Sequence, residues 1–153
     1  EFWLSIDHAW ADKLDALVQR HIAPGRVRPK LASNQLNGML KGYMDLVLEH
    51  EGRYYVADYK SNWLGVDSSA YTEDAMLAAV LQHRYEVQYV LYTYALHRLL
   101  QQRLPGYDYD RDVGGVRYWF LRGVDADNHG MYTGKPARAL IDALDVLFAP
   151  KAQ

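Results

Sequence analysis

The sequence contains no cysteine. Disulfides, thiolate zinc sites and iron–sulfur clusters are therefore excluded, and the composition fits a reducing compartment. Long hydrophobic runs are also missing, because no stretch reaches the roughly 18 apolar residues that a transmembrane helix needs. The opening Glu-Phe-Trp-Leu has neither the basic segment nor the long apolar core of a signal peptide. We expect a cytoplasmic protein without a membrane segment, and the absent initiator methionine fits a fragment of a longer chain.

Strong charge of either sign is absent as well. The formal net charge is −2 over 153 residues, which does not by itself indicate a nucleic-acid-binding protein. One local basic cluster, Arg26, Arg28 and Lys30, has the charge to contact phosphates. A solvated loop rich in proline and glycine explains this cluster equally well. Half of the residues are apolar, so residues 1–153 are long enough to form a single domain with its own core.

Two neighbouring runs rich in β-branched and aromatic residues predict an antiparallel hairpin. They are Gly42–Leu48 and Arg53–Lys60, separated by the turn Glu49–Gly52. Side chains alternate across a strand, so Asp58 and Lys60 should project from the same face. We consider two registers. A turn that pairs His50 with Arg53 places Asp45 directly opposite Asp58, and one that pairs Glu49 with Gly52 places Asp45 diagonal to it on the same face.

Two carboxylates and one ammonium group would then meet among apolar neighbours. Such an arrangement is costly unless a cation or an anionic substrate compensates it. Carboxylate oxygens without nearby thiolates suit Mg²⁺, or Mn²⁺ in its place, and a metal held this way can activate water against a phosphodiester. Lys60 could stabilise the charge that develops during the attack. The alternative is an ordinary surface ion pair between Asp58 and Lys60, worth roughly 0–1 kcal/mol.

The sequence around these residues resembles the nuclease motifs of the RecB-type exonucleases, a branch of the PD-(D/E)xK family. The resemblance covers most of the chain and is weakest between Asp7 and Asn37. The segments that carry it are Gly42–Asp45, Ala57–Gly65, Asp67–Tyr71, Gln82–Tyr85, Gln88–Tyr92 and Gly114–Asp125.

The resemblance implies a role for six residues of this sequence. Asp45 and Asp58 would ligate the metal together with the main-chain carbonyl of Tyr59, and Lys60 would be the catalytic lysine. Gln88 and Tyr92 match the family's Gln-x-x-x-Tyr motif, lie one helical turn apart, and are expected to brace the carboxylates or contact DNA.

One feature departs from the family pattern. Relatives complete the metal site with a histidine on a helix well upstream of the first aspartate. His8 and His21 follow the first expected strand, so neither matches that histidine, and Glu1 occupies a position where many relatives carry an acidic residue. We therefore expect an incomplete metal site in this fragment, with weak activity or none when it is alone.

The resemblance further implies the function of a Mg²⁺-dependent exonuclease domain that cleaves unwound DNA inside a bacterial helicase–nuclease complex. The implied partners are DNA, the RecC and RecD subunits, the RecA recombinase and a phage inhibitor. The implied roles are double-strand-break repair by recombination and destruction of foreign linear DNA. The alternative is a catalytically inactive module kept as a recombinase-loading or subunit-interaction surface. Such a module would be expected to lose one of the three charged residues, and here all three remain.

The order of the expected strands and helices predicts an α/β fold with a mixed central sheet flanked by helices. It resembles the restriction-endonuclease-like core of the family without the first helix of that core. We expect a strand over Glu1–Ile6, a helix over Ala9–His21, and the hairpin over Gln35–Leu48 and Arg53–Lys60. Tyr71–Arg103 should be the longest helical stretch, bent near His83–Arg84 and capped by Ser68 or Ser69. A stripe of apolar residues on it should be buried, comprising Tyr85, Tyr89, Tyr92, Leu96 and Leu99. Further on we expect an acidic loop over Gly106–Gly114, a central strand over Val116–Leu121, irregular chain over Gly123–Pro136 and a final amphipathic helix over Ala137–Phe148.

Overall fold

The computed structural model describes residues 8–32 and 46–149. The expected strand Glu1–Ile6, the hairpin residues from Gln35 to Asp45, and therefore Asp45 itself lie outside this part of the chain. The elements are α1 (His8–His21), β1 (Leu46–His50), β2 (Arg53–Lys60), α3 (Glu73–Gln82), α4 (Tyr85–Arg103), α5 (Tyr109–Asp112), β3 (Val113–Phe120), β4 (Met131–Gly134) and α6 (Arg138–Phe148), with short 3₁₀ turns at Ser68–Ala70 and Leu121–Gly123.

The strands form one mixed sheet in the order β1-β2-β3-β4. β1 and β2 are antiparallel, β2 and β3 are parallel, and β3 and β4 are antiparallel. The mixed sheet flanked by helices confirms the predicted α/β class. β3 has a partner on each side, which confirms its predicted central position.

The hairpin settles the choice between the two registers. His50 pairs with Arg53 and Leu46 pairs with Ala57. The two turn residues, Glu51 and Gly52, have φ angles of 51° and 74°, as a two-residue type I′ turn requires. The first of the two expected registers is therefore the one observed.

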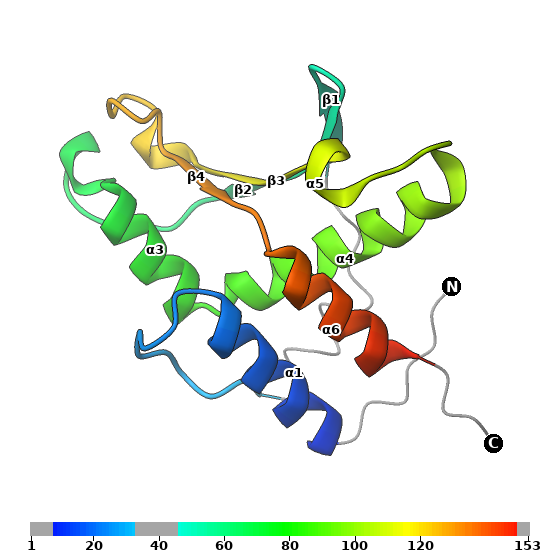
Figure 1. Ribbon diagram of the computed structural model, residues 1–153. Helices are drawn as coiled ribbons and strands as arrows, with labels where there is room; N and C mark the ends of the chain where they lie inside the picture. The colour runs from blue at the N-terminus through cyan, green and yellow to red at the C-terminus, as the bar shows by residue number, and fades with distance from the viewer. Residues whose placement is uncertain (1–7, 33–45, 150–153) are drawn as a thin grey trace.

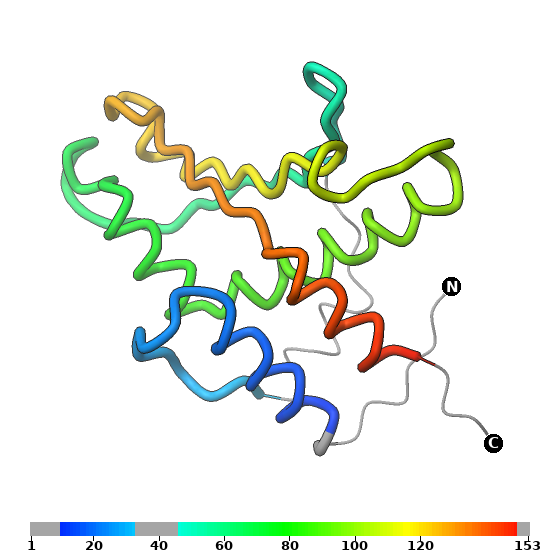
Figure 2. The backbone as a smooth tube through the Cα atoms, viewed as in Figure 1, coloured from blue at the N-terminus to red at the C-terminus, as the bar shows by residue number. Residues whose placement is uncertain are grey.

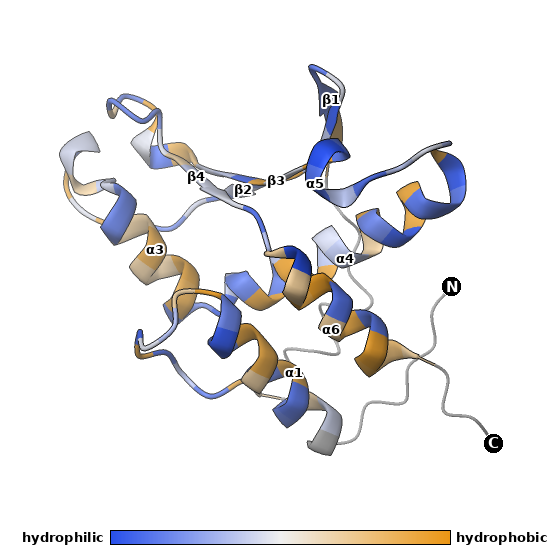
Figure 3. Cartoon of the chain, in the orientation of Figure 1, coloured by the Kyte–Doolittle hydropathy of each residue, from blue (hydrophilic) through white to orange (hydrophobic). Residues whose placement is uncertain are grey.

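Figure 1 shows α1, α3, α4 and α6 on one side of the sheet, and Figure 2 traces the same path as a tube. α4 packs against β2 and β3, and α1 packs against α4 and α6. Hydrophobic stretches of α1, α3 and α6 stand out in Figure 3. The core between sheet and helices contains Val56, Val116 and Phe120 from the strands and Leu140 and Leu144 from α6, all with no exposed surface.

The long helical stretch is two helices rather than one bent helix. α3 ends at Gln82, α4 begins at Tyr85, and Arg84 between them has a left-handed φ of 57°. Thr72 caps α3 by accepting a hydrogen bond from the N–H of Ala75, so the expectation of Ser68 or Ser69 as the cap of this helix is corrected. The expected buried stripe is also corrected at Leu99, which is 38% exposed.

Two short elements were not expected from the sequence. β4 lies within the stretch Gly123–Pro136, which was predicted to be irregular, and α5 lies within the predicted acidic loop. By contrast α6 begins one residue after the predicted helix start and ends at the predicted Phe148. In the described part of the chain, no helix combines the length and the apolar composition that crossing a bilayer requires.

Candidate active site

β2 places Asp58 and Lys60 on the face of the sheet that α4 covers. Their exposed fractions are 8% and 7%, whereas Tyr59 between them is 56% exposed on the opposite face. The alternation expected of a strand therefore holds at this point. Lys60 Nζ donates to Asp58 Oδ2 at 2.6 Å, and the main-chain N–H of Tyr59 donates to Asp58 Oδ1 at 2.7 Å. This is a buried ion pair and not the exposed pair of the alternative interpretation.

Gln88 on α4 connects the helix to this pair. Its Oε1 accepts from Lys60 Nζ at 2.9 Å and from the Tyr118 hydroxyl at 2.9 Å. Its Nε2 donates to the Tyr92 hydroxyl at 3.5 Å, one turn further along the helix. The structure thus brings Gln88 to Lys60, whereas the expectation was that Gln88 and Tyr92 brace the carboxylates. Tyr92 contacts Gln88, and a role of either residue in DNA binding stays a prediction.

Two aromatic rings complete the surroundings of the lysine. Lys60 Nζ lies 3.9 Å from the ring centroid of Tyr85 and 4.5 Å from that of Tyr118. Sequence reasoning assigned no functional role to either tyrosine. Spacing along the chain places Tyr85 on the same helix face as Gln88, and Tyr118 on the same strand face as Val116 and Phe120. It does not indicate that the two rings meet at Lys60.

The electrostatics keep Tyr118 a hydrogen-bond donor. Burial, and after it the negative charge of Asp58, hold the pKa of Tyr118 well above its usual value. A tyrosine hydroxyl is protonated at neutral pH even at its ordinary pKa of about 10, so this shift only widens the margin, and the hydroxyl donates to Gln88 Oε1. With both donors on the same oxygen, the side-chain amide of Gln88 has a single favourable orientation.

The oxygen atoms at this site suit a hard divalent cation. The carboxylate of Asp58 has further lone pairs besides those used by its two donors, and the carbonyl of Tyr59 belongs to the same strand. Within residues 8–32 and 46–149 there is no group of three histidine or acidic side chains that could hold a metal. Among the predicted ligands the described part contains Asp58 and Tyr59, while Asp45 lies outside it. The oxygen donors present in the described residues fit a hard divalent cation.

The expected basic cluster is not one continuous exposed patch. Arg28 has a side chain only 1% exposed, and its guanidinium bonds Glu86 and the carbonyls of Ile22 and Ala23. Arg28 is therefore not available to a phosphate in this structure. Arg26 pairs with Asp74 at 3.0 Å and Lys30 lies 3.8 Å from Asp12, both exposed, and their role in DNA binding stays a prediction.

Arg28 belongs to a buried ionic network that sequence reasoning missed. Arg84, with no exposed surface, donates to Asp15 Oδ1 at 2.6 Å and to Glu86 Oε1 at 2.7 Å. Burial opposes ionisation of Asp15, but hydrogen bonds from Arg84 and Gln19 outweigh it and lower its pKa. The network joins α1 to the first residues of α4, and so fixes the end of the helix that carries Tyr85 and Gln88.

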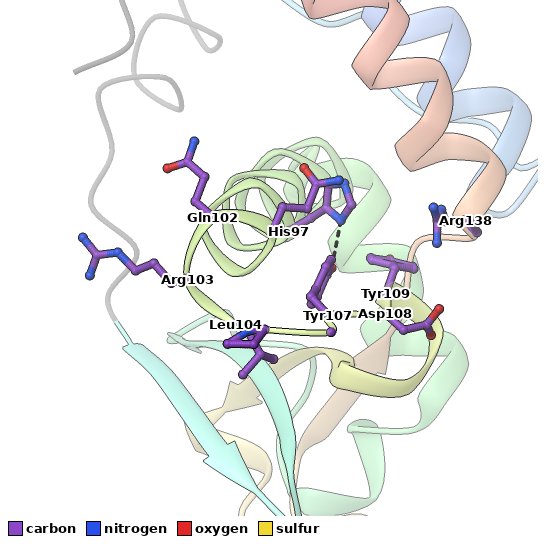
Figure 4. Close-up of a pocket in the computed structure, with 11 residues that line it drawn as sticks. His97, Gln102, Arg103, Leu104, Tyr107, Asp108, Tyr109 and Arg138 are labelled. Atoms are coloured by element: carbon purple, nitrogen blue, oxygen red, sulfur yellow. Dashed lines mark hydrogen bonds between the residues drawn. The ribbon is translucent and has the colours of Figure 1, made fainter.

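A separate cavity of about 510 Å³ lies at the other end of α4 (Figure 4). It is lined by His97, the segment Gln101–Tyr109 and Arg138. Tyr107 shares a hydrogen bond of 2.8 Å with His97 Nδ1, drawn as the dashed line in Figure 4. None of the residues around Lys60 lines this cavity, so it is not part of the candidate active site.

Known proteins are similar in sequence to most of this chain. Residues 4–146 match the sequence profile of the PD-(D/E)XK nuclease superfamily. The chain is 52% identical, over 97% of its residues, to the RecBCD enzyme subunit RecB of Escherichia coli. It is 45% identical over 77% of its residues to the RecB subunit of Haemophilus influenzae, and 36% identical over 80% to that of Mycolicibacterium smegmatis. It spans 13%, 10% and 12% of the lengths of these three relatives.

Proposed function

The chain belongs to the PD-(D/E)XK nuclease superfamily, and on that premise we propose that it is the Mg²⁺-dependent exonuclease domain of a larger helicase–nuclease subunit. The domain would hydrolyse phosphodiester bonds of DNA strands that the rest of the subunit has unwound. The observation that carries the proposal is the buried Asp58–Lys60 pair, held on the face of β2 that Gln88 contacts.

The metal would be held by Asp58, Asp45 and the carbonyl of Tyr59. The observed register pairs Leu46 with Ala57. If the pairing extends by one residue, Asp45 comes opposite Asp58 on the same face of the sheet, since directly paired residues share a face. When bound, Mg²⁺ supplies the Lewis acid that polarises the phosphodiester and lowers the pKa of a bound water.

The chain's own residues then have distinct tasks. Lys60 places a positive charge where the phosphate gains negative charge during the attack. Gln88 fixes the position of the Lys60 ammonium through a 2.9 Å hydrogen bond, and Tyr92 supports the amide of Gln88 from the next turn. Asp58 and Lys60 are almost fully buried, so little water competes with the hydrogen bonds of the Lys60 ammonium and these bonds are stronger than at the surface.

The names of the relatives support a wider role. Several similar proteins are RecB subunits of RecBCD enzymes. We infer that this domain works in the bacterial cytoplasm with RecC and RecD subunits, in recombinational repair of double-strand breaks and in the destruction of foreign linear DNA. RecA and a phage inhibitor would be further partners of its surface. A near-neutral domain with net charge −2 fits a setting in which other subunits deliver the DNA.

The alternative, an inactive module kept for recombinase loading, is less well supported. A buried ammonium and carboxylate are costly to maintain, and replacing such a pair by apolar residues is often neutral or stabilising. Retention of Asp58, Lys60 and Gln88 in one hydrogen-bonded group therefore favours catalysis.

The direct test is Asp58→Asn in the complete subunit assembled with its partners. We expect DNA unwinding to continue while DNA degradation falls by about a thousandfold or more, since an essential metal ligand is removed. Asp110→Asn, an exposed residue of α5, is the matched control and should leave both activities unchanged. Degradation at the unsubstituted rate in Asp58→Asn would reject the proposed site.

A further inference from the structure

The ammonium group of Lys60 lies in a corner formed by two aromatic rings. Nζ is 3.9 Å from the ring centroid of Tyr85, at the start of α4, and 4.5 Å from that of Tyr118, on β3. The two rings meet edge to face, with centroids 6.3 Å apart and planes at 89°. An ammonium over the face of an aromatic ring is attracted by the negative charge density of that face.

The hydroxyl groups of both tyrosines are engaged elsewhere. The Tyr118 hydroxyl donates to Gln88 Oε1 at 2.9 Å, and the Tyr85 hydroxyl lies 3.4 Å from Asn62 Oδ1. The rings therefore present their faces to Lys60, while their polar ends anchor them to neighbouring groups. Two of the three N–H donors of Lys60 have oxygen acceptors, Asp58 and Gln88, and the ring of Tyr85 is the closest aromatic neighbour of the ammonium.

We propose that Tyr85 and Tyr118 are positioning residues for the catalytic lysine, which they hold in one orientation beside Asp58. The inference rests on the proposed nuclease function, because it assigns Lys60 its role. A lysine side chain has four rotatable carbon–carbon bonds and loses much conformational freedom when it is fixed. The two rings restrict that freedom before substrate arrives, so the charge is already in place when the phosphate binds.

Another buried tyrosine of α4, Tyr94, offers a control for the effect of removing a tyrosine from this helix. Tyr94 lies on the same helix and is also buried, but it stacks on Phe148 and bonds Asp145. No contact between Tyr94 and Lys60 is observed among the described residues. Tyr94→Leu is therefore a control that removes a tyrosine of α4 without touching the corner.

The kinetic test uses the complete subunit with Tyr85→Leu, Tyr85→Phe and Tyr94→Leu. Tyr85→Leu should lower kcat for DNA degradation by about ten- to a hundredfold with KM nearly unchanged, because misplacement of a catalytic group costs that much. Tyr85→Phe keeps the ring and should restore kcat to within about twofold of the unsubstituted enzyme, as should Tyr94→Leu. Equal kcat in Tyr85→Leu and the unsubstituted enzyme would overturn the proposal.

A second measurement does not depend on activity. In NMR spectra of the 153-residue chain, the ε-methylene protons of Lys60 should be displaced upfield by the two rings. The displacement should shrink in Tyr85→Leu and persist in Tyr85→Phe and Tyr94→Leu. An unchanged Lys60 signal in Tyr85→Leu would show that the ring does not contact the ammonium, and would contradict the proposal even if the enzyme were active.

Unnatural side chains cover the case in which Tyr85→Leu does not fold. Phenylalanine with one, two or three ring fluorines at position 85 keeps the size of the ring and progressively weakens its attraction for a cation. A stepwise loss of kcat along this series supports the proposal that the Tyr85 ring positions the Lys60 ammonium, and a constant kcat refutes it. If instead Asp58→Asn degrades DNA normally, the proposed nuclease function is wrong. That result differs from one in which Asp58→Asn is inactive and only the positioning role of Tyr85 and Tyr118 is wrong.

Discussion

Gln88 is the residue on which the candidate site converges. One oxygen atom accepts hydrogen bonds from both Lys60 and Tyr118, and the nitrogen of the same amide contacts Tyr92. A group with this many partners cannot be replaced without leaving a buried donor unsatisfied, which costs roughly 1–3 kcal/mol. Gln88 thus connects α4 to the strand that carries Asp58 and Lys60.

Gln88→Leu should therefore lower the rate of DNA degradation by about tenfold or more. The substitution removes an acceptor from Lys60 Nζ and from the Tyr118 hydroxyl while roughly keeping side-chain volume. Steady-state kinetics on the complete subunit give the measurement, and Gln102→Leu, exposed near the end of the same helix, is the control. A kcat for Gln88→Leu equal to that of the control would argue against any role for the amide.

At this scale the sequence predicted part of the site. Alternation along β2 placed Asp58 and Lys60 on one face, and helical spacing placed Gln88 beside Tyr92. The contribution of Tyr85 and Tyr118 was not predicted, because it depends on how the start of α4 lies over β3. Such a contact joins residues distant in sequence, which local spacing does not encode.

The break between α3 and α4 is the element that orients the site. A bend was predicted at His83–Arg84. In the structure Arg84 has a left-handed backbone conformation, with a φ of 57°, and this residue separates the two helices. A non-glycine residue in this region is unfavourable, so the surroundings have to compensate it. The compensation is the buried network of Arg84 with Asp15, Glu86 and the carbonyl of Pro29. Asp15 and Pro29 are far from Arg84 in sequence, which explains why a pattern along the chain revealed the break but not its cause.

Arg84→Ala should destabilise the fold by about 3–5 kcal/mol. It leaves the buried carboxylate of Asp15 without its cation, and Glu86 then keeps only the longer contact of 3.3 Å with Arg28. Chemical denaturation monitored by circular dichroism gives the free energy of unfolding. Arg138→Ala provides the contrast, since its pair with Asp142 is largely exposed and its loss should cost no more than about 0.5 kcal/mol. Similar losses in the two variants would mean that the network contributes little.

β4 was missed for a related reason. It has only four residues and ends at Gly134, so it shows no clear alternation. Its pairing with β3, from Val116–Gly134 to Trp119–Met131, is what makes it a strand. Longer elements such as α6 were predicted closely, because their own apolar periodicity is enough to define them.

Over the whole molecule, one sheet carries the candidate site while the helices on one side of it supply most of the core. Away from that site, the stability of the molecule depends on pH through His97. Burial, the largest effect, lowers the pKa of His97 and outweighs Asp145, whose Oδ2 lies 3.7 Å from Nε2. Arg98, Arg138 and the Tyr107 hydroxyl also face the ring, and both arginines act in the same direction as burial.

The free energy of unfolding should therefore fall as the pH drops from about 7 to about 5. In that window the unfolded chain binds a proton at His97 before the folded chain does, so protonation favours unfolding until the folded residue also titrates. His97→Gln should be less stable at neutral pH but show a flatter dependence. His129→Gln, which alters an exposed histidine, should keep the original slope. Identical slopes in the His97 and His129 variants would contradict this assignment.

We propose that Asp45 and Asp58 share one divalent cation on the face of β2 that carries Lys60. Crystals of the protein grown with Mn²⁺ and measured for anomalous scattering test it most directly. We predict a single strong peak about 2.1 Å from a carboxylate oxygen of each aspartate and from the carbonyl of Tyr59. A map without that peak, or with the carboxylate of Asp45 on the opposite face of the sheet from Asp58, would contradict the account.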